Sequence, residues 1–479
     1  MSAWIGATPH ARIGDFDFFD LIIALMGFTA TERKAAMGLA SVFATRMLGL
    51  FMIMPVFAIY GPELQGFTSF WMGLAIGIYG LTQACLQIPM GHLSDRVGRK
   101  PVIYAGLVVF AIGSVIAAVA DHIVWVTIGR ALQGAGAISS ALLALAADLS
   151  SDEQRPKVMA VIGVFIGLSF TIALIVGPLV AGPFGLAGLF WLTAGLSMLS
   201  ILVIRFWVPD ATSVAPRGDT SARWPLMKKL VHDGQLWRFN SAVLVIHFCM
   251  TCLFTVLPSL LLPVSASGSQ LWHSLLPVLL ISFVLLIPMM KVFNARGQIK
   301  AGLICSALLM ATATALFVTS PSYLILLVAA VLFFAGFNYL EAGLPSMVSL
   351  FAPAGQKGSA MGIFTSCQFG GAFVGGLVAG SLLQWHGQTA VFIAMLIALL
   401  GWAVFALGLQ QRHHLKSVNF AVTQSNGNWL DQLLEQPGVA EAVYVPEEQV
   451  VYLKVNKHEF DAQRVMALIN APAAELKEN

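Results

Sequence analysis

The chain has 479 residues, of which 58% are hydrophobic and only 10% are charged, and its formal net charge is +3. A water-soluble domain of this length needs a far more polar surface, so the composition excludes an ordinary soluble protein. It favours a chain whose helices lie in a lipid bilayer.

Residues 1–36 form an N-terminal segment outside the main apolar pattern. The run DFDFFDLIIALMGF is too short to span a bilayer and begins with acids rather than bases, so it does not predict a signal peptide. Met26 stands directly before GFTATERKAAMGL and is an alternative start of translation, in which case residues 1–25 need no function.

Apolar stretches of the roughly 20 residues that a membrane-spanning helix needs follow along the chain. Six helices are predicted over 37–60, 70–91, 101–120, 123–149, 157–181 and 186–208. Six more are predicted over 237–262, 271–290, 299–318, 322–349, 359–383 and 388–409. The polar linker 209–236 is rich in Pro, Ser and Thr, and it divides an N-terminal half, 37–208, from a C-terminal half, 237–410.

The lysines and arginines are distributed unevenly between the predicted loops. The loops that follow odd-numbered helices contain neither residue, whereas the other loops and the central linker contain many. Because basic residues stay on the cytoplasmic side of a membrane, we expect both termini in the cytoplasm. An even number of helices requires the same side for both. The prediction is a multi-pass protein of a bacterial inner (plasma) membrane.

The two sets of helices are related by an internal repeat. IPMGHLSDRVG at 88–98 aligns with IPMMKVFNARG at 287–297, and GPLVAG at 177–182 aligns with GGLVAG at 375–380. The repeat predicts two copies of one six-helix unit, an organisation that is common in transporters. The predicted fold class is an all-α membrane protein with twelve transmembrane helices in two pseudo-symmetric halves.

The stretch GHLSDRVGRK at 91–100 concentrates charge between two apolar helices. Positive residues there could simply set the topology, but that reading does not explain Asp95 or the two glycines. In the second repeat Asn294 replaces Asp95 and the arginine after the second glycine is also lost, whereas that glycine is kept. Because the turn persists without the charges, we expect the charges to have a function of their own.

Three motifs resemble those of one transporter family. The first is G-x-x-x-D-R-x-G-R-[KR], whose fixed positions match Gly91, Asp95, Arg96, Gly98, Arg99 and Lys100. The second and third are a motif of helix 4 and an antiporter motif of helix 5, matched by Arg130 and Gln133 and by Gly177, Pro178 and Gly182. Over about 37–410 the chain therefore resembles the major facilitator superfamily, in which two six-helix halves alternate access to a central site.

The resemblance implies that helix 2 lies beside helix 11 where the two halves meet. Asp95 would then face the amide-rich N-terminus of helix 11 near Gly358, which carries partial positive charge. Arg99 would pair with Asp148 at the cytoplasmic end of helix 4. We expect these residues, with the rest of the first motif, to act as a conformational latch that stabilises the outward-open state by about 1–2 kcal/mol per contact.

Ionisable residues inside the predicted helices are few and costly, so each is a candidate for binding substrate or protons. The candidates are Arg46, Arg130 with Gln133, His247 and Glu341. A carboxyl group in an apolar helix can exchange a proton because burial disfavours its charged form, which favours Glu341. The alternative for each is a structural hydrogen bond or ion pair within its own half, and we favour that role for His247.

Residues 413–479 have an ordinary soluble composition and predict a β-α-β-β-α domain. The segments are the strands KSVNFAV, VAEAVYV and QVVYLKV and the helices NWLDQLLEQPG and EFDAQRVMALI. The pattern resembles a small ferredoxin-like domain that follows helix 12 in some relatives. It contains no cysteine to bind a metal, and its excess of acids argues against nucleic acid as a partner. Self-association, ligand sensing and docking onto the transporter stay open.

The sequence contains no G-x-x-x-x-G-K-[ST] run for ATP and predicts no enzyme, cofactor or metal site. We expect a secondary transporter whose partners are a small molecule, protons and the bilayer, and the helix 5 motif favours proton-coupled export. The first alternative is a proton-linked importer or facilitator of a sugar or other nutrient. The second is a membrane sensor whose C-terminal domain is the output.

Overall fold

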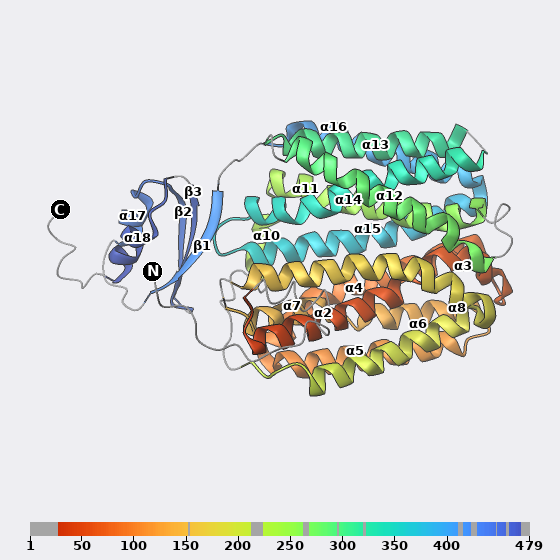
Figure 1. Ribbon diagram of the computed structural model, residues 1–479, viewed down its shortest axis with the longest axis horizontal. Coiled ribbons are helices and arrows are strands. Elements are labelled where there is room, and N and C mark those ends of the chain that lie inside the picture. The colour runs from red at the N-terminus through yellow and green to blue at the C-terminus, as the bar shows by residue number, and fades with distance from the viewer. Residues whose placement is uncertain are drawn as a thin grey trace, which may run out of the picture.

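The computed structural model describes residues 27–151, 154–211, 224–261, 268–294, 297–319, 322–410, 415–422, 429–446, 448–456 and 459–470. They form a bundle of long helices with a small domain containing a three-stranded sheet at one end (Figure 1). We call this end of the bundle the domain end and the opposite one the far end.

In the described part of the chain, seven α-helices form the N-terminal half. They are α2 (Ala30–Phe51), α3 (Met54–Tyr60), α4 (Ser69–Val97), α5 (Arg99–Ala118), α6 (Ile123–Ala135), α7 (Ser139–Asp148) and α8 (Arg155–Phe206). The pairs α2/α3 and α6/α7 each make up one span, with the 3-10 helix η1 (Gly61–Glu63) ending the first. Gly185, with φ 61° and ψ −164°, interrupts α8 and divides it into two spans.

The helices of the C-terminal half are more regular. They are α11 (Gly234–Leu261), α12 (Trp272–Phe293), α13 (Ile299–Thr319), α14 (Tyr323–Phe351), α15 (Lys357–His386) and α16 (Gln388–Phe405). Three short helices flank them, namely α10 (Trp224–Leu230), η3 (Gly268–Gln270) and η4 (Ala406–Gly408). Eleven stretches of the described residues are long and apolar enough to cross a membrane, and with α8 counted as two the number is the predicted twelve.

Two helix ends differ from the sequence prediction in ways that matter for the site. The first span starts at Ala30 rather than at 37, because Thr29 and Glu32 form a capping box in which each side chain accepts a hydrogen bond from the other's backbone N–H. Helix α4 runs on to Val97, so Asp95 belongs to its last turn. The expected loop between helices 2 and 3 is reduced to a turn at Gly98.

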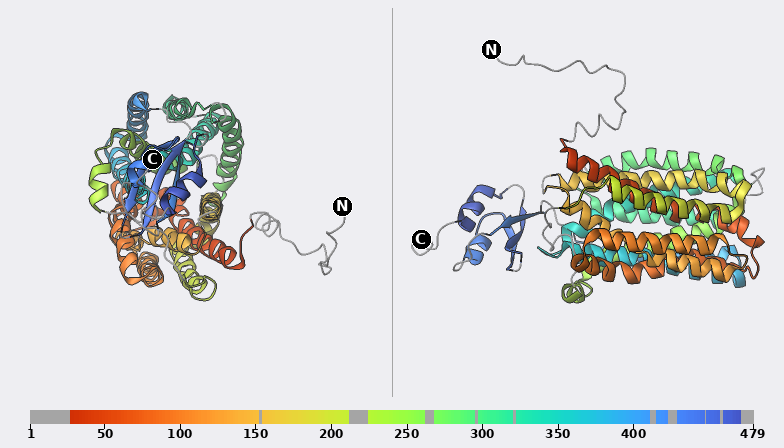
Figure 2. Two further views of the ribbon diagram at one scale, coloured as in Figure 1. Left: turned by 90° about the vertical axis from the view of Figure 1, so that its left-hand side faces the viewer. Right: turned by 90° about the horizontal axis from the view of Figure 1, so that it is seen from below.

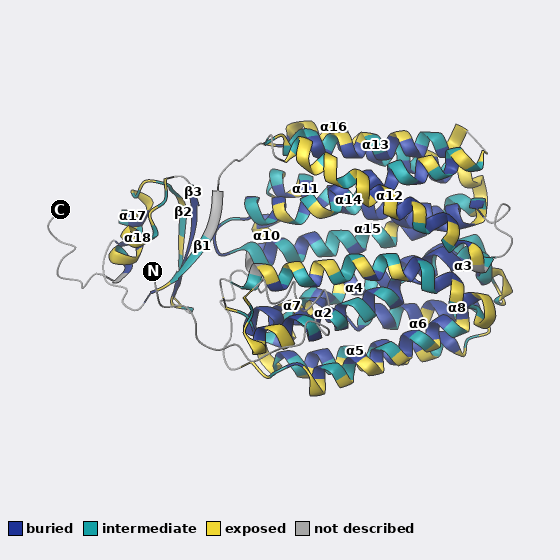
Figure 3. Ribbon diagram, in the orientation of Figure 1, coloured by how far each residue is buried: buried dark blue, intermediate teal, exposed yellow. Residues whose placement is uncertain are grey.

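Exposed residues lie along the outer faces of the helices (Figure 3), and many of them are large and apolar. Val284 is 64% exposed, Ile397 67% and Val404 68%, all within helices of high hydropathy. An apolar outer surface of this extent is what a bundle surrounded by lipid requires.

The two halves meet most closely along α4 and α15, which pack antiparallel and come into backbone contact at glycines. A Cβ atom on Gly73 would lie 2.1 Å from the carbonyl oxygen of Gly376, and one on Gly80 would lie 2.5 Å from that of Phe369. Small residues of this kind let two membrane helices approach to backbone contact. We call this contact the α4–α15 seam.

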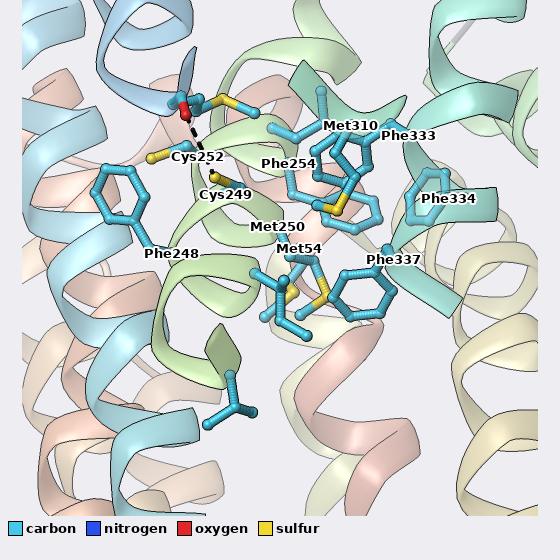
Figure 4. Packing of buried hydrophobic residues seen from close by; sticks show 14 of the residues in the cluster. Met54, Phe248, Cys249, Met250, Cys252, Phe254, Met310, Phe333, Phe334 and Phe337 are labelled. Carbon is cyan, nitrogen blue, oxygen red and sulfur yellow. Dashed lines mark hydrogen bonds between the residues drawn. The ribbon is translucent and has the colours of Figure 1, made fainter. Parts of the chain in front are cut away.

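A cluster of aromatic and methionine side chains joins the halves nearer the far end. The ring of Phe170 on α8 lies 6.1 Å from that of Phe254 on α11 and 6.2 Å from that of Phe334 on α14. Figure 4 shows Phe254 and Phe334 among neighbours from α11, α13 and α14, with Met54 of α3 beside them. The cluster packs the N-terminal half against the C-terminal half through apolar side chains.

The C-terminal domain has the predicted order of elements. It consists of β1 (Leu415–Ala421), α17 (Trp429–Leu434), β2 (Val439–Val445), β3 (Val450–Asn456) and α18 (Ala462–Asn470). The sheet is antiparallel in the order β1-β3-β2, and Val451, Leu453 and Val455 of β3 form a core with both helices. The strands lie between these helices and the membrane bundle (Figures 1 and 2).

Candidate functional site

The turn between α4 and α5 is built by one glycine in a left-handed conformation. Gly98 has φ 105° and both ends α4 and precedes α5, and Gly297 at the equivalent place of the second repeat has φ 68°. Residues with a Cβ adopt such angles only with strain, so both repeats need glycine there. The turn is therefore independent of the surrounding charges, as the sequence comparison indicated.

Arg99 is the centre of a buried charged cluster at the domain end. Its Nε donates to Asp148 Oδ2 at 3.0 Å, and its Nη1 donates to Ser94 Oγ at 2.9 Å and to the carboxylate of Asp95. The three charged side chains are between 3% and 10% exposed. Such burial is tolerated because each charge has an opposite partner, and the cluster links α4, α5 and α7. It contains the Arg99–Asp148 pair expected from the sequence.

The remaining residues of the first motif lie around this cluster. Lys100 Nζ donates to the carbonyl of Val208 at 2.8 Å and pairs with Asp210 at 2.6 Å, which joins α5 to the end of α8. This hydrogen bond and the charge of Lys100 hold the pKa of Asp210 below its ordinary value. Gly91 lies against Ser140 of α7, and the side chain of Arg96 is exposed.

The second repeat has an uncharged contact in the equivalent place. Asn294, which stands where Asp95 does in the first repeat, accepts a hydrogen bond of 2.8 Å from the hydroxyl of Tyr339. The two halves are therefore alike in backbone but different in charge, and the buried ion pairs belong to the N-terminal half.

The α4–α15 seam brings the charged cluster to the level of the start of α15. Gln87 Nε2 donates to the carbonyl of Gly362 at 3.4 Å and to Ser366 Oγ at 3.3 Å. From Gln87, Asp95 lies about 12 Å further along α4 towards the domain end, at 1.5 Å per residue. Because the helices are antiparallel, this is also the direction in which α15 reaches its N-terminus at Lys357.

Arg46 of α2 is buried in the N-terminal half without an acidic partner among the described residues. Its Nη2 donates to Gln83 Oε1 at 2.6 Å and to Tyr79 Oη at 3.3 Å, and its guanidinium lies 5.7 Å from the ring of Phe110. The side chain is 3% exposed, and within the described part of the chain Nε and Nη1 have no hydrogen-bond partner. A buried guanidinium with two unused donors is costly, which makes Arg46 a candidate for an anionic or strongly polar ligand.

Arg130 and Gln133 bind each other inside the same half. Arg130 Nη1 donates to Gln133 Oε1 at 2.8 Å, and Gln133 Nε2 donates to Ser114 Oγ at 2.8 Å. The guanidinium also lies 5.0 Å from the ring of Tyr79, which thus contacts both buried arginines. Arg130 is 1% exposed, and within the described residues its Nη2 has no hydrogen-bond partner, so it stays a candidate for binding a polar ligand as Arg46 does.

Glu341 and His247 come together in the C-terminal half, on α14 and α11. Gln368 of α15 joins them, since its Nε2 donates to Glu341 Oε1 at 3.1 Å and lies 2.9 Å from His247 Nε2. His247 Nδ1 lies 3.0 Å from the carbonyl of Val243, an arrangement that puts the imidazole proton on Nδ1 and leaves Nε2 as the acceptor. Glu341 Oε2 is 3.8 Å from His247 Nε2, and its side chain is 39% exposed.

Sequence reasoning missed Gln368, Tyr79 and Gln83, although each binds a predicted site residue. A glutamine or tyrosine in an apolar helix is a weak signal, because either residue is also common in packing. The signal that could have found them is the free-energy cost of burying a side-chain amide without a polar partner. Gln83 is 0% exposed, so it needs such a partner.

The helix 5 motif packs against a break in the first span. A Cβ atom on Gly177 would lie 2.5 Å from the carbonyl oxygen of Met52, in the interval between α2 and α3. Pro178 lies within α8, and Gly182 is exposed. Of the three motif residues, Gly177 is therefore the one that fixes α8 against α2 and α3.

Comparison with known proteins agrees with this architecture. The family model of the Major Facilitator Superfamily matches residues 39–289 and 264–437. The inner membrane transport protein YajR of Escherichia coli K12 is 36% identical over 432 residues, or 89% of this chain and 95% of that protein. The quinolone resistance protein NorA of Staphylococcus aureus MRSA252 is 24% identical over 389 residues, or 77% of this chain and 95% of that protein.

Among solved structures, the nucleoside transporter NupG superposes with a TM-score of 0.63 at 15% identity, covering 78% of this chain and 99% of that chain. The small C-terminal sheet is consistent with the ferredoxin-like domain expected from the sequence. The chain is a multi-pass membrane transporter, and it belongs to the Major Facilitator Superfamily.

Proposed function

We propose that the protein is a proton-coupled exporter of a small molecule and works by alternating access between its two halves. The observation that carries the proton coupling is the contact of Glu341, His247 and Gln368, which come from three different helices of the C-terminal half. Two titratable groups within 4 Å in a membrane helix bundle are suited to take up and release a proton.

The proton step follows from the hydrogen bonds of this group. With Glu341 ionised, the amide of Gln368 donates to the carboxylate and to His247. A proton on Glu341 turns one carboxylate oxygen into a donor and weakens the hydrogen bond from Gln368. A proton on His247 Nε2 removes the acceptor there and favours a direct pair with Glu341. Protonation therefore changes which of α11, α14 and α15 are held together, and this couples the proton to helix movement.

The domain end is the cytoplasmic end in this proposal, with both termini inside and the protein in the inner membrane. The uneven distribution of Lys and Arg supports this orientation, since Arg99, Lys100 and Lys357 all lie at helix starts of the domain end. The relative YajR is named as an inner membrane protein, which supports the location.

The charge latch consists of Asp95, Arg99 and Asp148. When the cytoplasmic side is closed, Asp95 binds the N-terminal amides of α15, while Arg99 holds Asp95 in place and anchors to Asp148. Opening towards the cytoplasm breaks the contact with α15. The position of Asp95 along the α4–α15 seam and its burial with Arg99 support this role. In the second repeat the equivalent residue is the uncharged Asn294, so the proposal assigns the latch to the N-terminal half.

Substrate binding is assigned to Arg46, which is buried inside the N-terminal half. Its unused donors suit an acidic or carbonyl-rich group on the transported molecule. The sequence relation to NorA, which is named as a quinolone resistance protein, favours export over import. Import driven by the same proton site is the second candidate, because the contacts of Glu341 do not set a direction.

The test is a transport screen in everted membrane vesicles that are acidified inside by respiration. Drug-like organic acids and cations are added, and release of protons is followed with a pH-sensitive dye. We expect at least one compound to release protons with the wild type and with Asp121→Asn, an exposed acid at the far end that serves as the control. Glu341→Gln should abolish the release. Release that persists in Glu341→Gln would contradict proton coupling at this site.

A further inference from the structure

The C-terminal domain contacts the membrane bundle at the end of α14 and at the loop that joins α14 to α15 (residues 352–356). Lys454 Nζ donates to the carbonyl of Leu350 at 2.5 Å, and Glu441 Oε2 accepts the backbone N–H of Ala354 at 3.1 Å. The ring of Tyr452 lies against Gly355, where a Cβ atom would be 3.0 Å from the ring. Both sides of the loop are therefore held by polar contacts from the domain.

The residues that make these contacts share one face of the sheet. In β3, Val451, Leu453 and Val455 point to the helices of the domain, so Val450, Tyr452 and Lys454 occupy the opposite face. Glu441 of β2 is the cross-strand neighbour of Lys454. A small antiparallel sheet ordinarily leaves this second face in water, whereas here the loop covers it.

Lys454 is 1% exposed, which is unusual for a lysine and costly unless its charge is used. Its ammonium lies at the C-terminus of α14, where the helix dipole is negative, and donates to a carbonyl group of the last turn. Glu441 in turn accepts an N–H of the loop that precedes α15. The positive ammonium of Lys454 therefore faces carbonyl groups at the end of α14, and the negative carboxylate of Glu441 faces an N–H group of the loop. We call Lys454 and Glu441 the docking pair.

We propose that the docking pair positions the first turn of α15 and that the C-terminal domain thereby controls closure of the cytoplasmic side. α15 begins at Lys357, directly after the docked loop, and its N-terminus is the partner of Asp95 in the charge latch. When the loop is docked, the N-terminus of α15 is held next to Asp95 along the length of the bundle. When the loop is released, that position is not fixed. This inference rests on the proposed latch for its effect on closure, but the docking itself does not.

The docking is tested by hydrogen–deuterium exchange of the full-length protein, read from peptides that contain Ala354. We expect exchange to be at least tenfold faster in Lys454→Met and in Glu441→Gln than in the wild type. Lys454→Arg should restore slow exchange. Arg464→Gln, which removes a charge that is 71% exposed in the same domain, is the matched control and should leave it unchanged. Unchanged exchange in both docking variants would overturn the proposal.

The effect on closure is tested with spin labels at Val97 and Val292, which are 59% and 41% exposed and lie at the domain ends of α4 and α12. The population with the short distance should fall at least threefold in Lys454→Met and not in Arg464→Gln. If Lys454→Met keeps the distance distribution of the wild type while Asp95→Asn changes it, the control by the C-terminal domain is overturned and the charge latch is not. Normal distributions in both would refute the latch as well.

Discussion

At the scale of single residues, the buried cluster around Arg99 has the largest energetic consequence. Arg99 and Asp148 are 9% and 3% exposed, and removal of the Asp148 charge leaves the buried Arg99 with Asp95 as its acidic partner. We predict that Asp148→Asn destabilises the protein by about 3 kcal/mol, the lower part of the range for broken buried pairs. Thermal unfolding in detergent measures this, with Asp121→Asn as the exposed control. Equal melting temperatures for both variants would show that the pair is unimportant for stability.

Glu341→Gln separates the hydrogen bonds of the C-terminal cluster from its proton. The glutamine keeps an acceptor for Gln368, so the fold and the melting temperature should stay near those of the wild type. The variant cannot bind the proton, so transport should lose its dependence on the pH gradient while exchange of substrate across the membrane continues. Transport by wild type and variant at several imposed gradients distinguishes these effects, and a preserved gradient dependence would contradict the role of Glu341.

Single residues were predictable where a family motif, or the free-energy cost of burying a charge in an apolar helix, pointed to them. The family resemblance implied the pairing of Arg99 with Asp148, and Arg46 and Glu341 stood out as charges in apolar helices. The contact of His247 with Glu341 was not foreseen, because 94 positions along the chain separate them and only the packing of α11 against α14 and α15 brings them together. Gln368 was missed for the same reason.

At the scale of helices, the α4–α15 seam depends on glycines at backbone contact. Gly73→Ala would place its Cβ 2.1 Å from a carbonyl oxygen of Gly376 and push the two helices apart. We predict a destabilisation of about 1–3 kcal/mol, typical of overpacking, and a loss of transport. Gly167→Ala on α8 is the matched control, because a Cβ there meets nothing within 4 Å, and it should be neutral or slightly stabilising. A Gly73→Ala variant as stable as Gly167→Ala would argue against close packing at the seam.

The helices themselves were readable from hydropathy, but their ends were not. The prediction ended helix 2 at 91, because the charges of GHLSDRVGRK break the apolar run. In the structure α4 continues through them to Val97, since the carboxylates and the guanidinium satisfy one another. The Gly185 break in α8 falls between the predicted helices 5 and 6, as their spacing required.

At the scale of the whole molecule, the orientation in the membrane can be tested directly. Trp385 at the far end is 73% exposed, and Val97 at the domain end is 59% exposed. We predict that a membrane-impermeant maleimide labels Trp385→Cys in intact spheroplasts and labels Val97→Cys only after permeabilisation. The reverse pattern would invert the proposed topology and the direction of transport with it. The chain without these substitutions, which has two exposed cysteines of its own, gives the background labelling.

The two halves and the C-terminal domain were predictable because each follows from a local or repeated pattern. Strand β2 coincides with the predicted segment VAEAVYV. The docking of the domain was not predictable, because it depends on a lysine and a glutamate that look like ordinary surface residues until the loop of α14 and α15 covers them. Long-range contacts between separately folded parts leave no periodic signal in the sequence.

The charge latch is tested most directly by the distance between spin labels at Val97 and Val292 in Asp95→Asn. A contact of about 1.4 kcal/mol between Asp95 and the N-terminus of α15 corresponds to a tenfold change in the equilibrium between closed and open forms. The account predicts that the short-distance population of the wild type falls roughly tenfold relative to the long-distance one. Identical distance distributions in Asp95→Asn and the wild type would contradict it.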